Sequence, residues 1–283
     1  MKHHQKQAKF YDSHPPLSPW PAYFARTGLS LLYKPREVFW KKHLDTLGIS
    51  KNSRLLEVGS GQGIFLNRLY ARYRARCYGV DISPRSVSYA DRRFRSPRLS
   101  YLVGNATRLP FEDASFDFVV SFDVLEHVQD QPEAVREMLR VLKPGGKILI
   151  YTLNSNYRLT PDWFLEKLGI DIFARAAHKR ELFIDPKALS QTITDLGATP
   201  LHLELFDAFF TLLLDEIIML SLLLFQKARF FNFNSFGAAY LRFLSLLTHA
   251  LYLPLHTLDR LWYSKGYSLS FVLIAAKNAK KKA

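Results

Sequence analysis

Residues 53–154 alternate between two hydrophobic patterns. Short, nearly continuous apolar runs, typical of buried parallel strands, are separated by segments with apolar residues at helical spacing. The predicted strands are residues 53–59, 77–83, 99–106, 116–123 and 147–153; the predicted helices are 64–73, 84–95 and a segment ending at Leu142, and KPGG at 143–146 is a predicted turn. Strands alternating with helices predict an α/β fold with a parallel sheet and right-handed crossovers. A last strand is expected within residues 266–277.

The chain before and after this pattern has other features. Residues 1–35 are rich in proline and aromatic residues without a clear period, so we expect a cap segment and no long helix there. A short helix is predicted at 36–48, where it ends on a glycine. Another follows Asp185 as N-cap, with Pro186 at its first position and Gly197 beyond its end.

Residues 203–262 form a third kind of region. Between Ala208 and Phe225, 14 of 18 residues are apolar, and a second apolar stretch runs from Phe236 to Leu258. We predict an apolar helical hairpin that turns near residues 232–235 and is inserted before the last strand. The chain is then divided into the cap segment, an α/β domain of residues 36–202 and 263–283, and this insertion.

Both arms of the predicted hairpin have a narrow polar stripe at helical spacing. The two stripes consist of Glu204, Asp207, Thr211 and Asp215, and of Arg242, Ser245, His249 and His256. Antiparallel pairing predicts that Asp215 lies near His256 and Asp207 near Arg260. The apolar backs are expected to face lipid or a lipophilic substrate, and the alternative is burial against the sheet or in a dimer. A simple membrane span is disfavoured, because each acidic residue at the bilayer centre costs about 2.5–3.5 kcal/mol.

Charge and composition narrow the choice of partners. The net charge of +14 favours anionic partners, either nucleic acid or acidic lipid headgroups. The single cysteine, Cys77, excludes a disulfide framework and a cysteine-based zinc site. The start of the chain has no apolar run typical of a secretory signal, so the expected location is the cytoplasm, in association with the membrane.

Polar and glycine residues follow three of the predicted strands. The segment from Glu57 to Gly63, with Gly59 and Gly61 between them, joins a strand to a helix, and glycines there permit a tight turn and close approach of a ligand. The further candidates at strand ends are Asp81 and Ile82, and Asn105 and Ala106. The Asp81 carboxylate can accept both hydroxyls of a ribose, and the Asn105 amide can bond an adenine edge. The three strand ends predict an adenosine-shaped slot.

The glycines are spaced G-x-G-x-G and follow an acidic residue, whose carboxylate would repel the pyrophosphate of a dinucleotide but tolerates a cationic cofactor. This motif resembles that of class I S-adenosylmethionine-dependent methyltransferases. Further matches to that family are GVDIS, LPFEDASFDFVVS and VLKPGGKILIY. The resemblance implies a Rossmann-like, seven-stranded, mostly parallel sheet with helices on both faces, and S-adenosyl-L-methionine as cofactor.

A narrower resemblance concerns SFDVLEHVQD, LKPGGKILIYTLN and HKRELFIDPKAL. These segments are similar to the O-methyltransferases of ubiquinone biosynthesis, which methylate polyprenylated catechols. The resemblance implies that Arg36 contacts the cofactor, that Phe122 lines its pocket and that His178 lies near the substrate. It ends at about residue 200, before the apolar insertion.

Asp123, Glu126 and His127 stand at i, i+3 and i+4, so on a helix they share one face. Two carboxylates and an imidazole at that spacing predict a site for a divalent cation such as Mg²⁺, which would lower the pKa of a catechol hydroxyl. His127 without a metal is an alternative general base, as is His178. The third interpretation is that these residues only border the cofactor pocket or cap the next helix.

The leading hypothesis is a methyltransferase that acts at the membrane surface on a lipophilic acceptor, such as an oxygen of a quinone precursor or another lipid. The alternatives are an RNA or soluble small-molecule methyltransferase and a non-catalytic membrane adaptor. Nucleic acid is the less expected partner, because the sequence has no Asn-Pro-Pro-aromatic motif for amino methylation. The sequence leaves the oligomeric state open.

Overall fold

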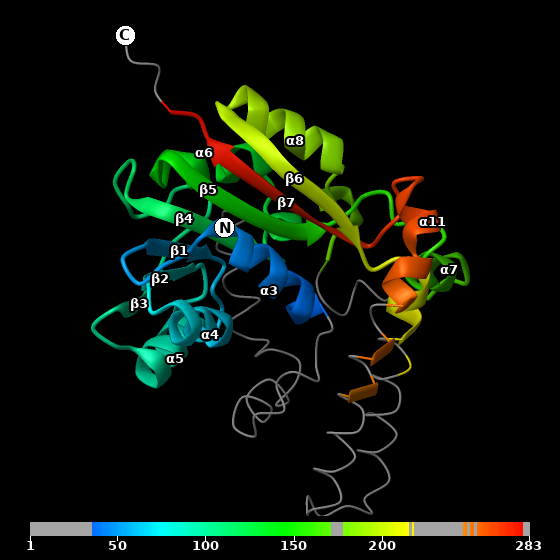
Figure 1. Cartoon of the computed structure of the whole chain (residues 1–283), viewed down its shortest axis with the longest axis horizontal. Coiled ribbons are helices and arrows are strands. Elements are labelled where there is room, and N and C mark those ends of the chain that lie inside the picture. The colour runs from blue at the N-terminus through cyan, green and yellow to red at the C-terminus, as the bar shows by residue number, and fades with distance from the viewer. Residues whose placement is uncertain are drawn as a thin grey trace, which may run out of the picture.

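The computed structural model describes residues 36–170, 178–214, 217, 246–247, 250–251 and 254–279, with side chains from residue 41 onward. Seven strands form one sheet in the order β3-β2-β1-β4-β5-β7-β6 (Figure 1). They are β1 Arg54–Val58, β2 Arg76–Asp81, β3 Leu99–Val103, β4 Phe116–Phe122, β5 Leu142–Leu153, β6 Ala198–Phe206 and β7 Ser270–Lys277. The pairs from β3 to β5 are parallel, and β7 is antiparallel to both of its neighbours. The predicted α/β fold with a mostly parallel, seven-stranded sheet is confirmed.

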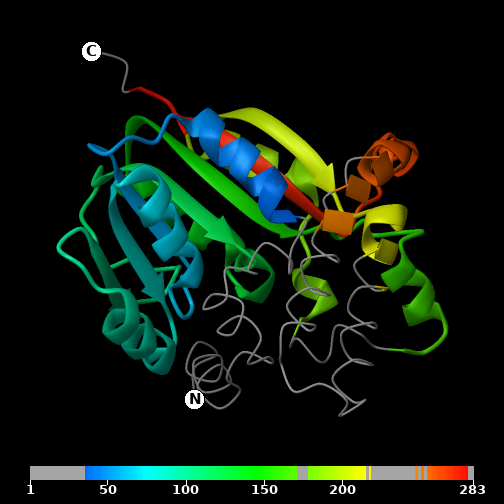
Figure 2. The same cartoon turned by 60° about the horizontal axis from the view of Figure 1, so that its bottom comes forward.

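Helices cover both faces of the sheet, as predicted (Figure 1 and Figure 2). Apolar side chains of α3 Arg36–Leu47, α4 Ile64–Tyr73 and α5 Pro84–Phe94 pack on one face. Those of α6 Gln131–Val141 and α8 Pro186–Asp195 pack on the other. The short helices α7 Pro161–Lys167 and α11 Arg260–Tyr263 lie beyond one end of the sheet, and two 3-10 turns, η2 Leu125–His127 and η4 Arg180–Leu182, complete the domain.

Local capping explains why several helices begin and end where the sequence predicts. The side chain of Asp185 accepts hydrogen bonds from the first turn of α8, whose first residue is Pro186. Asp130 and Ser83 cap α6 and α5 in the same way. Gly48, directly after α3, has a φ of +84°, a conformation that costs glycine little.

The KPGG segment is not a separate turn before β5. It belongs to β5, which begins at Leu142 and pairs with β4 through an irregularity. Phe116 lies opposite Leu142, and Phe118 lies opposite Lys147, so the extra residues protrude from the ladder. The two glycines make this protrusion sterically accessible.

The predicted insertion begins later than residue 203. Residues Leu203 to Phe206 pair with β7 as the end of β6, so Glu204 belongs to a strand and not to a polar helical stripe. Ladder hydrogen bonds to β7 outweigh the helical period that the sequence shows there. Asp207 follows in left-handed conformation and is fully buried, and its carboxylate accepts hydrogen bonds from Tyr151 and Ser270. These contacts hold Asp207 against β5 and β7; the predicted proximity to Arg260 stays a prediction.

The two ends of the insertion meet at a buried aspartate. Asp259 accepts hydrogen bonds from the backbone N–H of Phe210 at 2.8 Å and of Thr211 at 3.1 Å, and from the Thr211 hydroxyl at 2.7 Å. The carboxylate therefore caps the helical turn after β6 from a segment almost 50 residues later in the chain. The predicted turn at 232–235 and the predicted Asp215–His256 contact lie outside the described residues, as do cap segment 1–35 and the side chain of Arg36. Among the helices that the structure describes, none is long and apolar enough to cross a bilayer.

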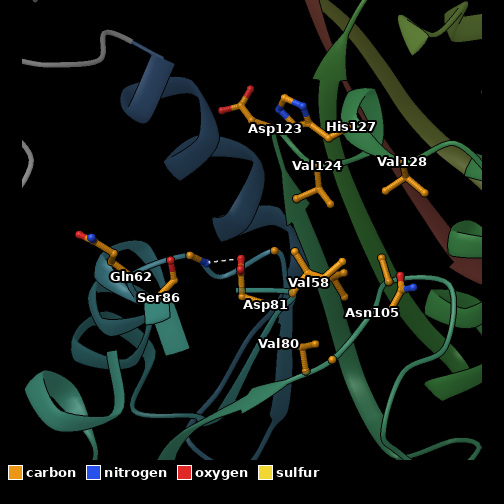
Figure 3. Close-up of a pocket in the computed structure, with 15 residues that line it drawn as sticks. Val58, Gln62, Val80, Asp81, Ser86, Asn105, Asp123, Val124, His127 and Val128 are labelled. Carbon is orange, nitrogen blue, oxygen red and sulfur yellow. Dashed lines mark hydrogen bonds between the residues drawn. The ribbon is translucent and has the colours of Figure 1, made fainter. Parts of the chain in front are cut away.

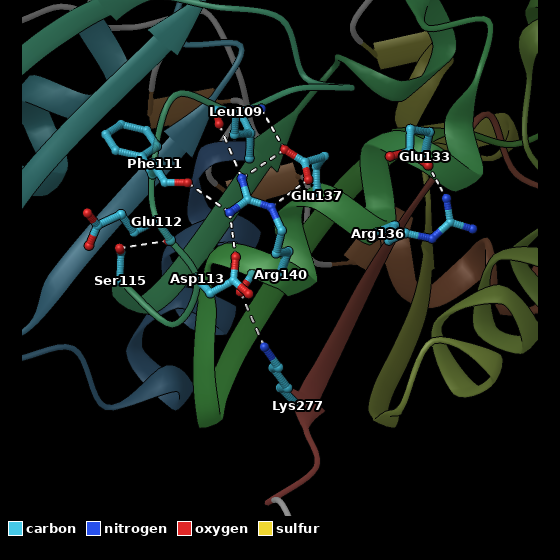
Figure 4. A network of polar contacts seen from close by, with 10 residues as sticks. All are labelled: Leu109, Phe111, Glu112, Asp113, Ser115, Glu133, Arg136, Glu137, Arg140 and Lys277. Atoms are coloured by element: carbon cyan, nitrogen blue, oxygen red, sulfur yellow. Dashed lines mark hydrogen bonds and ion pairs between the residues drawn. The ribbon is translucent and has the colours of Figure 1, made fainter.

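The loop between β3 and β4 is fixed by Arg140 of α6 (Figure 4). Its guanidinium donates to Glu137 at 2.6 Å, to Asp113 at 2.7 Å and to the Phe111 carbonyl at 2.8 Å. Glu137 in turn accepts from the backbone N–H of Leu109 at 2.7 Å. This network explains the polar residues of the LPFED segment and holds the loop that follows Asn105 at the end of β3.

Candidate functional site

An open cleft of about 300 Å³ lies at the carboxyl ends of β1, β2, β3 and β4. This is the edge at which parallel α/β sheets bind their ligands. Each strand end contributes to its wall: Gly59 after β1, Asp81 at the end of β2, Asn105 after β3 and His127 after β4 (Figure 3). The predicted residues Gly61, Ile82, Ala106 and Asp123 line the same cleft. Sequence positions that are up to 68 residues apart therefore converge as predicted for an adenosine-shaped slot.

The glycine turn is shaped by backbone conformations that suit glycine. Gly59 has a φ of +79°, and a Cβ there would lie 2.1 Å from the Cγ2 of Val124. Gly61 has a φ of +50° but open space around it. Gly63 precedes α4 and does not line the cleft; its missing Cβ makes room for the Tyr101 ring. The turn thus depends on glycine for two reasons, conformation and close packing.

Two backbone amides hold the Asp81 carboxylate at the tip of β2. Oδ2 accepts a hydrogen bond from Gly61 N–H at 2.8 Å, and Oδ1 accepts one from Ser83 N–H at 2.9 Å. Figure 3 shows the bond between Asp81 and the glycine turn across the floor of the cleft. The carboxylate is therefore pre-oriented at the position expected to bind ribose hydroxyls.

Glu57 does not line the cleft, in contrast to its predicted contact with the cofactor. It is 3% exposed, beneath the glycine turn. Burial, and secondarily the negative charge of Asp81, raise the pKa of Glu57 to about 8. The side chain is mostly an uncharged carboxylic acid at pH 7, so it adds little repulsion or attraction of its own to the cleft.

The predicted Asp123–Glu126–His127 triad does not form as a helical face. Asp123 has a φ of +53°, and the 3-10 turn η2 begins only at Leu125, so the i, i+3, i+4 geometry of an α-helix is absent from this segment. His178 takes the place of Asp123: the ligand atoms of Glu126, His127 and His178 all lie within 4.8 Å of one another. The fully buried Glu126 accepts a hydrogen bond from Thr152 at 2.8 Å.

The two predicted catalytic histidines lie together. The rings of His127 and His178 are stacked with centroids 4.7 Å apart. Burial, with a smaller contribution from His178, lowers the pKa of His127 to about 3. Burial also lowers the pKa of His178, against the opposing charge of Asp123. Both imidazoles are therefore neutral at pH 7 and retain a lone pair that can accept a proton or coordinate a metal.

Other residues differ from the prediction in smaller ways. Phe122 is buried and packs edge-to-face on Phe65 at 4.6 Å, outside the described wall of the cleft. Sequence reasoning missed further residues of the wall, which are Val58, Gln62, Val80, Ser86, Gly104, Val124 and Val128. All of them stand within five positions of a predicted residue, so their place next to the strand ends is the signal that could have found them.

Residues 56–150 match the family described as "Methyltransferase domain". This segment of the chain is therefore a methyltransferase domain. The matched range contains the end of β1, all of β2 to β4 and most of β5, with every described strand end that lines the cleft.

Curated relatives of the methyltransferase domain include norajmaline N-methyltransferase of Rauvolfia serpentina, which is 35% identical over 104 residues, or 35% of this chain and 36% of that protein. Tocopherol O-methyltransferase of Arabidopsis thaliana is 35% identical over 106 residues, or 36% of this chain and 30% of that protein. The matches thus span about a third of these relatives, and they concern the core of the domain.

The fold extends further than the sequence similarity. The structure is similar to that of geranyl diphosphate C-methyltransferase from Streptomyces coelicolor in complex with Mg²⁺, geranyl diphosphate and S-adenosyl-L-homocysteine, with a TM-score of 0.53 and 18% identity. The alignment covers 83% of this chain and 76% of that one. At this identity the likeness establishes the fold. The three proteins methylate nitrogen, oxygen and carbon, so they do not determine the acceptor atom of this chain.

Proposed function

We propose that the protein transfers a methyl group from S-adenosyl-L-methionine to a lipophilic acceptor at a membrane surface, with a hydroxyl of a quinone-precursor-like catechol as the leading acceptor. The observation that carries the proposal is the cleft itself. Its glycine turn and fixed carboxylate stand on one side, and the neutral His127, stacked on His178 behind it, stands on the other.

The residues of the cleft fit the proposed cofactor. The glycine turn packs closely on Val124 at Gly59, and it leaves open space at Gly61, where a ligand can approach the backbone. Asp81 presents a carboxylate for ribose hydroxyls, and Asn105 presents an amide from the end of the neighbouring strand. When bound, the cofactor supplies an activated methyl group on a sulfonium, so the protein chiefly has to position the acceptor and exclude water.

His127 is placed to accept the proton of an acceptor hydroxyl. It lines the cleft, and its stacked neighbour His178 fixes the orientation of the ring. Because its pKa is about 3, His127 is deprotonated throughout the neutral range and available as a base. A divalent metal is an additional element of the proposal, and Glu126, His127 and His178 would hold it. Two imidazoles and one carboxylate suit a transition metal better than Mg²⁺.

Exposed apolar side chains support a lipophilic acceptor and membrane contact. Around α7, α11 and the base of the insertion, Leu168 is 76% exposed, Leu261 71% and Ile217 57%. Phe209 stacks on Trp262 at 5.5 Å in the same region, which lies at one end of the sheet (Figure 2). Leucines this exposed are costly in water and favourable in a lipid interface. The net charge of +14 adds attraction to an anionic surface.

The test combines binding and turnover on vesicles. We expect the protein to sediment with vesicles containing anionic phospholipid, and to methylate a prenylated catechol in those vesicles faster than catechol in water. Leu168→Asp/Leu261→Asp should reduce vesicle binding at least about 10-fold without changing cofactor affinity. Leu201→Asp, at a leucine 54% exposed on β6, is the matched control and should bind vesicles normally.

Two outcomes would contradict the proposal. Equal turnover of catechol with and without a prenyl chain, with no vesicle binding, would favour a soluble small-molecule methyltransferase. Salt-sensitive retention of RNA with methylation of that RNA would favour the nucleic-acid alternative. His127→Gln tests the proposed base separately from the acceptor. This variant should lower methyl transfer to a hydroxyl about 100-fold. Turnover before and after treatment with a chelator decides whether the reaction needs a metal.

A further inference from the structure

A second cluster of histidines and a carboxylate lies away from the cleft, where three parts of the chain meet. His43 comes from α3, and His202 and Glu204 come from the edge strand β6. His256 comes from the segment that leads into α11. Since His202 and Glu204 are two positions apart on a strand, both side chains emerge on the sheet face that α3 covers.

Three imidazole nitrogens converge on one carboxylate. The Nε2 atoms of His43 and His202 lie 3.0 Å and 3.1 Å from the same oxygen, Oε2 of Glu204. The Nε2 of His256 lies 3.7 Å from the other oxygen, Oε1. The ligand atoms of His43, His202 and Glu204 all lie within 4.8 Å of one another.

Within the described residues, the Nε2 of His43 is held close to Glu204 without a well-aligned hydrogen bond. The residue is 3% exposed, and its Nε2 is buried with no aligned hydrogen bond to the part of the chain that the structure describes. Buried polar atoms are almost always satisfied. This atom points at the centre of the cluster, where a cation would be coordinated by it.

His256 is oriented as outer contacts orient a metal ligand. Its Nδ1 is hydrogen-bonded to the hydroxyl of Tyr263 at 3.1 Å, which leaves Nε2 directed to the cluster. Its ring also stacks on Phe206 at 5.9 Å. The imidazole therefore has a defined position at the rim of the cluster.

We propose that His43, His202 and Glu204 bind a divalent transition-metal ion, Zn²⁺ above all, and that His256, whose ligand atom lies outside the 4.8 Å group formed by the other three, moves in as the fourth ligand. Tetrahedral zinc with ligands at about 2.0–2.1 Å places neighbouring ligand atoms about 3.3 Å apart. The distances of 3.0, 3.1 and 3.7 Å between the nitrogens and the carboxylate lie on both sides of that value. Three histidines and a glutamate also match the ligand preference of zinc.

Four protein ligands would leave no open coordination position, which is typical of a structural and not a catalytic zinc. The ion would join α3, β6 and the segment before α11 at one point. It would therefore fix the last segment of the insertion to the domain, independently of the function proposed for the cleft.

The test is the zinc content and zinc affinity of the untagged full-length protein, in a His3→Gln/His4→Gln background that removes two histidines at the start of the chain. We expect one equivalent of zinc that resists dialysis. His202→Ala, at a side chain that is 45% exposed and so tolerates replacement, should weaken zinc binding about 100-fold, and Glu204→Gln should do the same. Glu181→Gln, at an exposed carboxylate, is the matched control and should keep the equivalent.

Two further measurements separate this site from the cleft and from a plain hydrogen-bonded cluster. His127→Ala should retain the equivalent of zinc, and Co²⁺ in its place should give the intense visible bands of a tetrahedral complex, which His202→Ala should abolish. Zinc should raise the Tm of the background protein by about 5 °C and leave that of His202→Ala unchanged. The proposal is overturned if the background protein does not bind zinc at 100 μM. It is also overturned if His127→Ala loses zinc and His202→Ala retains it.

Discussion

The cofactor side of the cleft and the base of the insertion are built in different ways. On the cofactor side, the decisive contacts join neighbours in the chain: Gly61 and Asp81 are 20 residues apart and meet through a backbone amide. At the base of the insertion, outside the lining of the cleft, buried side chains join distant segments. Tyr151 bonds to Ser270 at 2.7 Å across 119 residues, and Asp259 caps the turn at Thr211 across 48.

Burial keeps two titratable groups at or beneath the cleft uncharged at neutral pH, with opposite consequences. Glu57 is protonated because its pKa is raised to about 8, and His127 is deprotonated because its pKa is lowered to about 3. The folded protein therefore resists ionisation of Glu57 as pH rises and protonation of His127 as pH falls. The cleft needs no fixed charge beyond its exposed carboxylates to receive a cationic cofactor that leaves as a neutral product.

The largest effect is expected for Glu57→Gln. Between pH 4.5 and pH 8 folded Glu57 holds a proton that the unfolded chain has lost, so the free energy of unfolding falls as pH rises. The full loss is roughly 5 kcal/mol, at about 1.4 kcal/mol per pKa unit. The neutral amide of Gln does not titrate, so the variant lacks this pH-dependent loss. Its free energy of unfolding should therefore rise relative to that of the natural protein between pH 4.5 and pH 8, as measured by urea denaturation at several pH values.

Glu181→Gln serves as the control for this pH series, because Glu181 is exposed. Its stability should follow that of the natural protein at every pH. A constant difference between Glu57→Gln and the natural protein from pH 4.5 to pH 8 would show that the cofactor side holds no buried neutral acid.

This contrast also explains how much of the molecule could be predicted from the sequence. The succession of strands and helices along the chain, the capping of α8 and the glycine turn depend on residues within one strand–helix unit, and the periodicity of the sequence reports such units. The cleft residues at strand ends were predicted for the same reason, since parallel strands bring their carboxyl ends to one edge.

The remaining features depend on tertiary contacts that no local pattern encodes. His178 replaces Asp123 beside His127 because the chain after β5 returns to the cleft 51 residues later. Glu204 lies in a strand because β7 pairs with it, although its spacing also suits a helical stripe. Glu57 is buried because α4 packs over β1. The residue type alone, an acid, would not predict this burial.

The next largest effect is expected for Gly59→Ala, which tests how strictly the cofactor side depends on its backbone. The new Cβ would lie 2.1 Å from Val124 in a residue with a φ of +79°. Cofactor affinity should fall at least about 100-fold, or about 2.7 kcal/mol, because the turn must move into the cleft. Isothermal titration with S-adenosyl-L-methionine measures the loss.

Gly61→Ala is the matched variant for Gly59→Ala. Its Cβ would meet nothing within 4 Å, so only backbone strain of about 1–2 kcal/mol opposes it. Adding Val124→Ala to Gly59→Ala should recover part of the affinity, since it removes the atom that clashes. Equal losses for both glycine variants, without recovery in the double variant, would mean that packing against Val124 does not shape the turn.

The smallest effect is expected at the base of the insertion, for Asp259→Ala. This change removes the carboxylate that accepts from Phe210 and Thr211, and leaves buried donors without a partner. Loss of such a cap costs about 2 kcal/mol, so hydrogen exchange at the first turn after β6 should accelerate roughly 30-fold. Cofactor affinity should change less than about twofold, because the cofactor side is held by its own local contacts, which do not include the bonds to Asp259.

Thr211→Val, which removes one of the three donors to Asp259, should accelerate hydrogen exchange less, in the same direction. Asp259→Ala could instead weaken cofactor binding as much as Gly59→Ala does. The cofactor side and the base of the insertion would then form one cooperative unit, and their different construction would not make their stabilities independent.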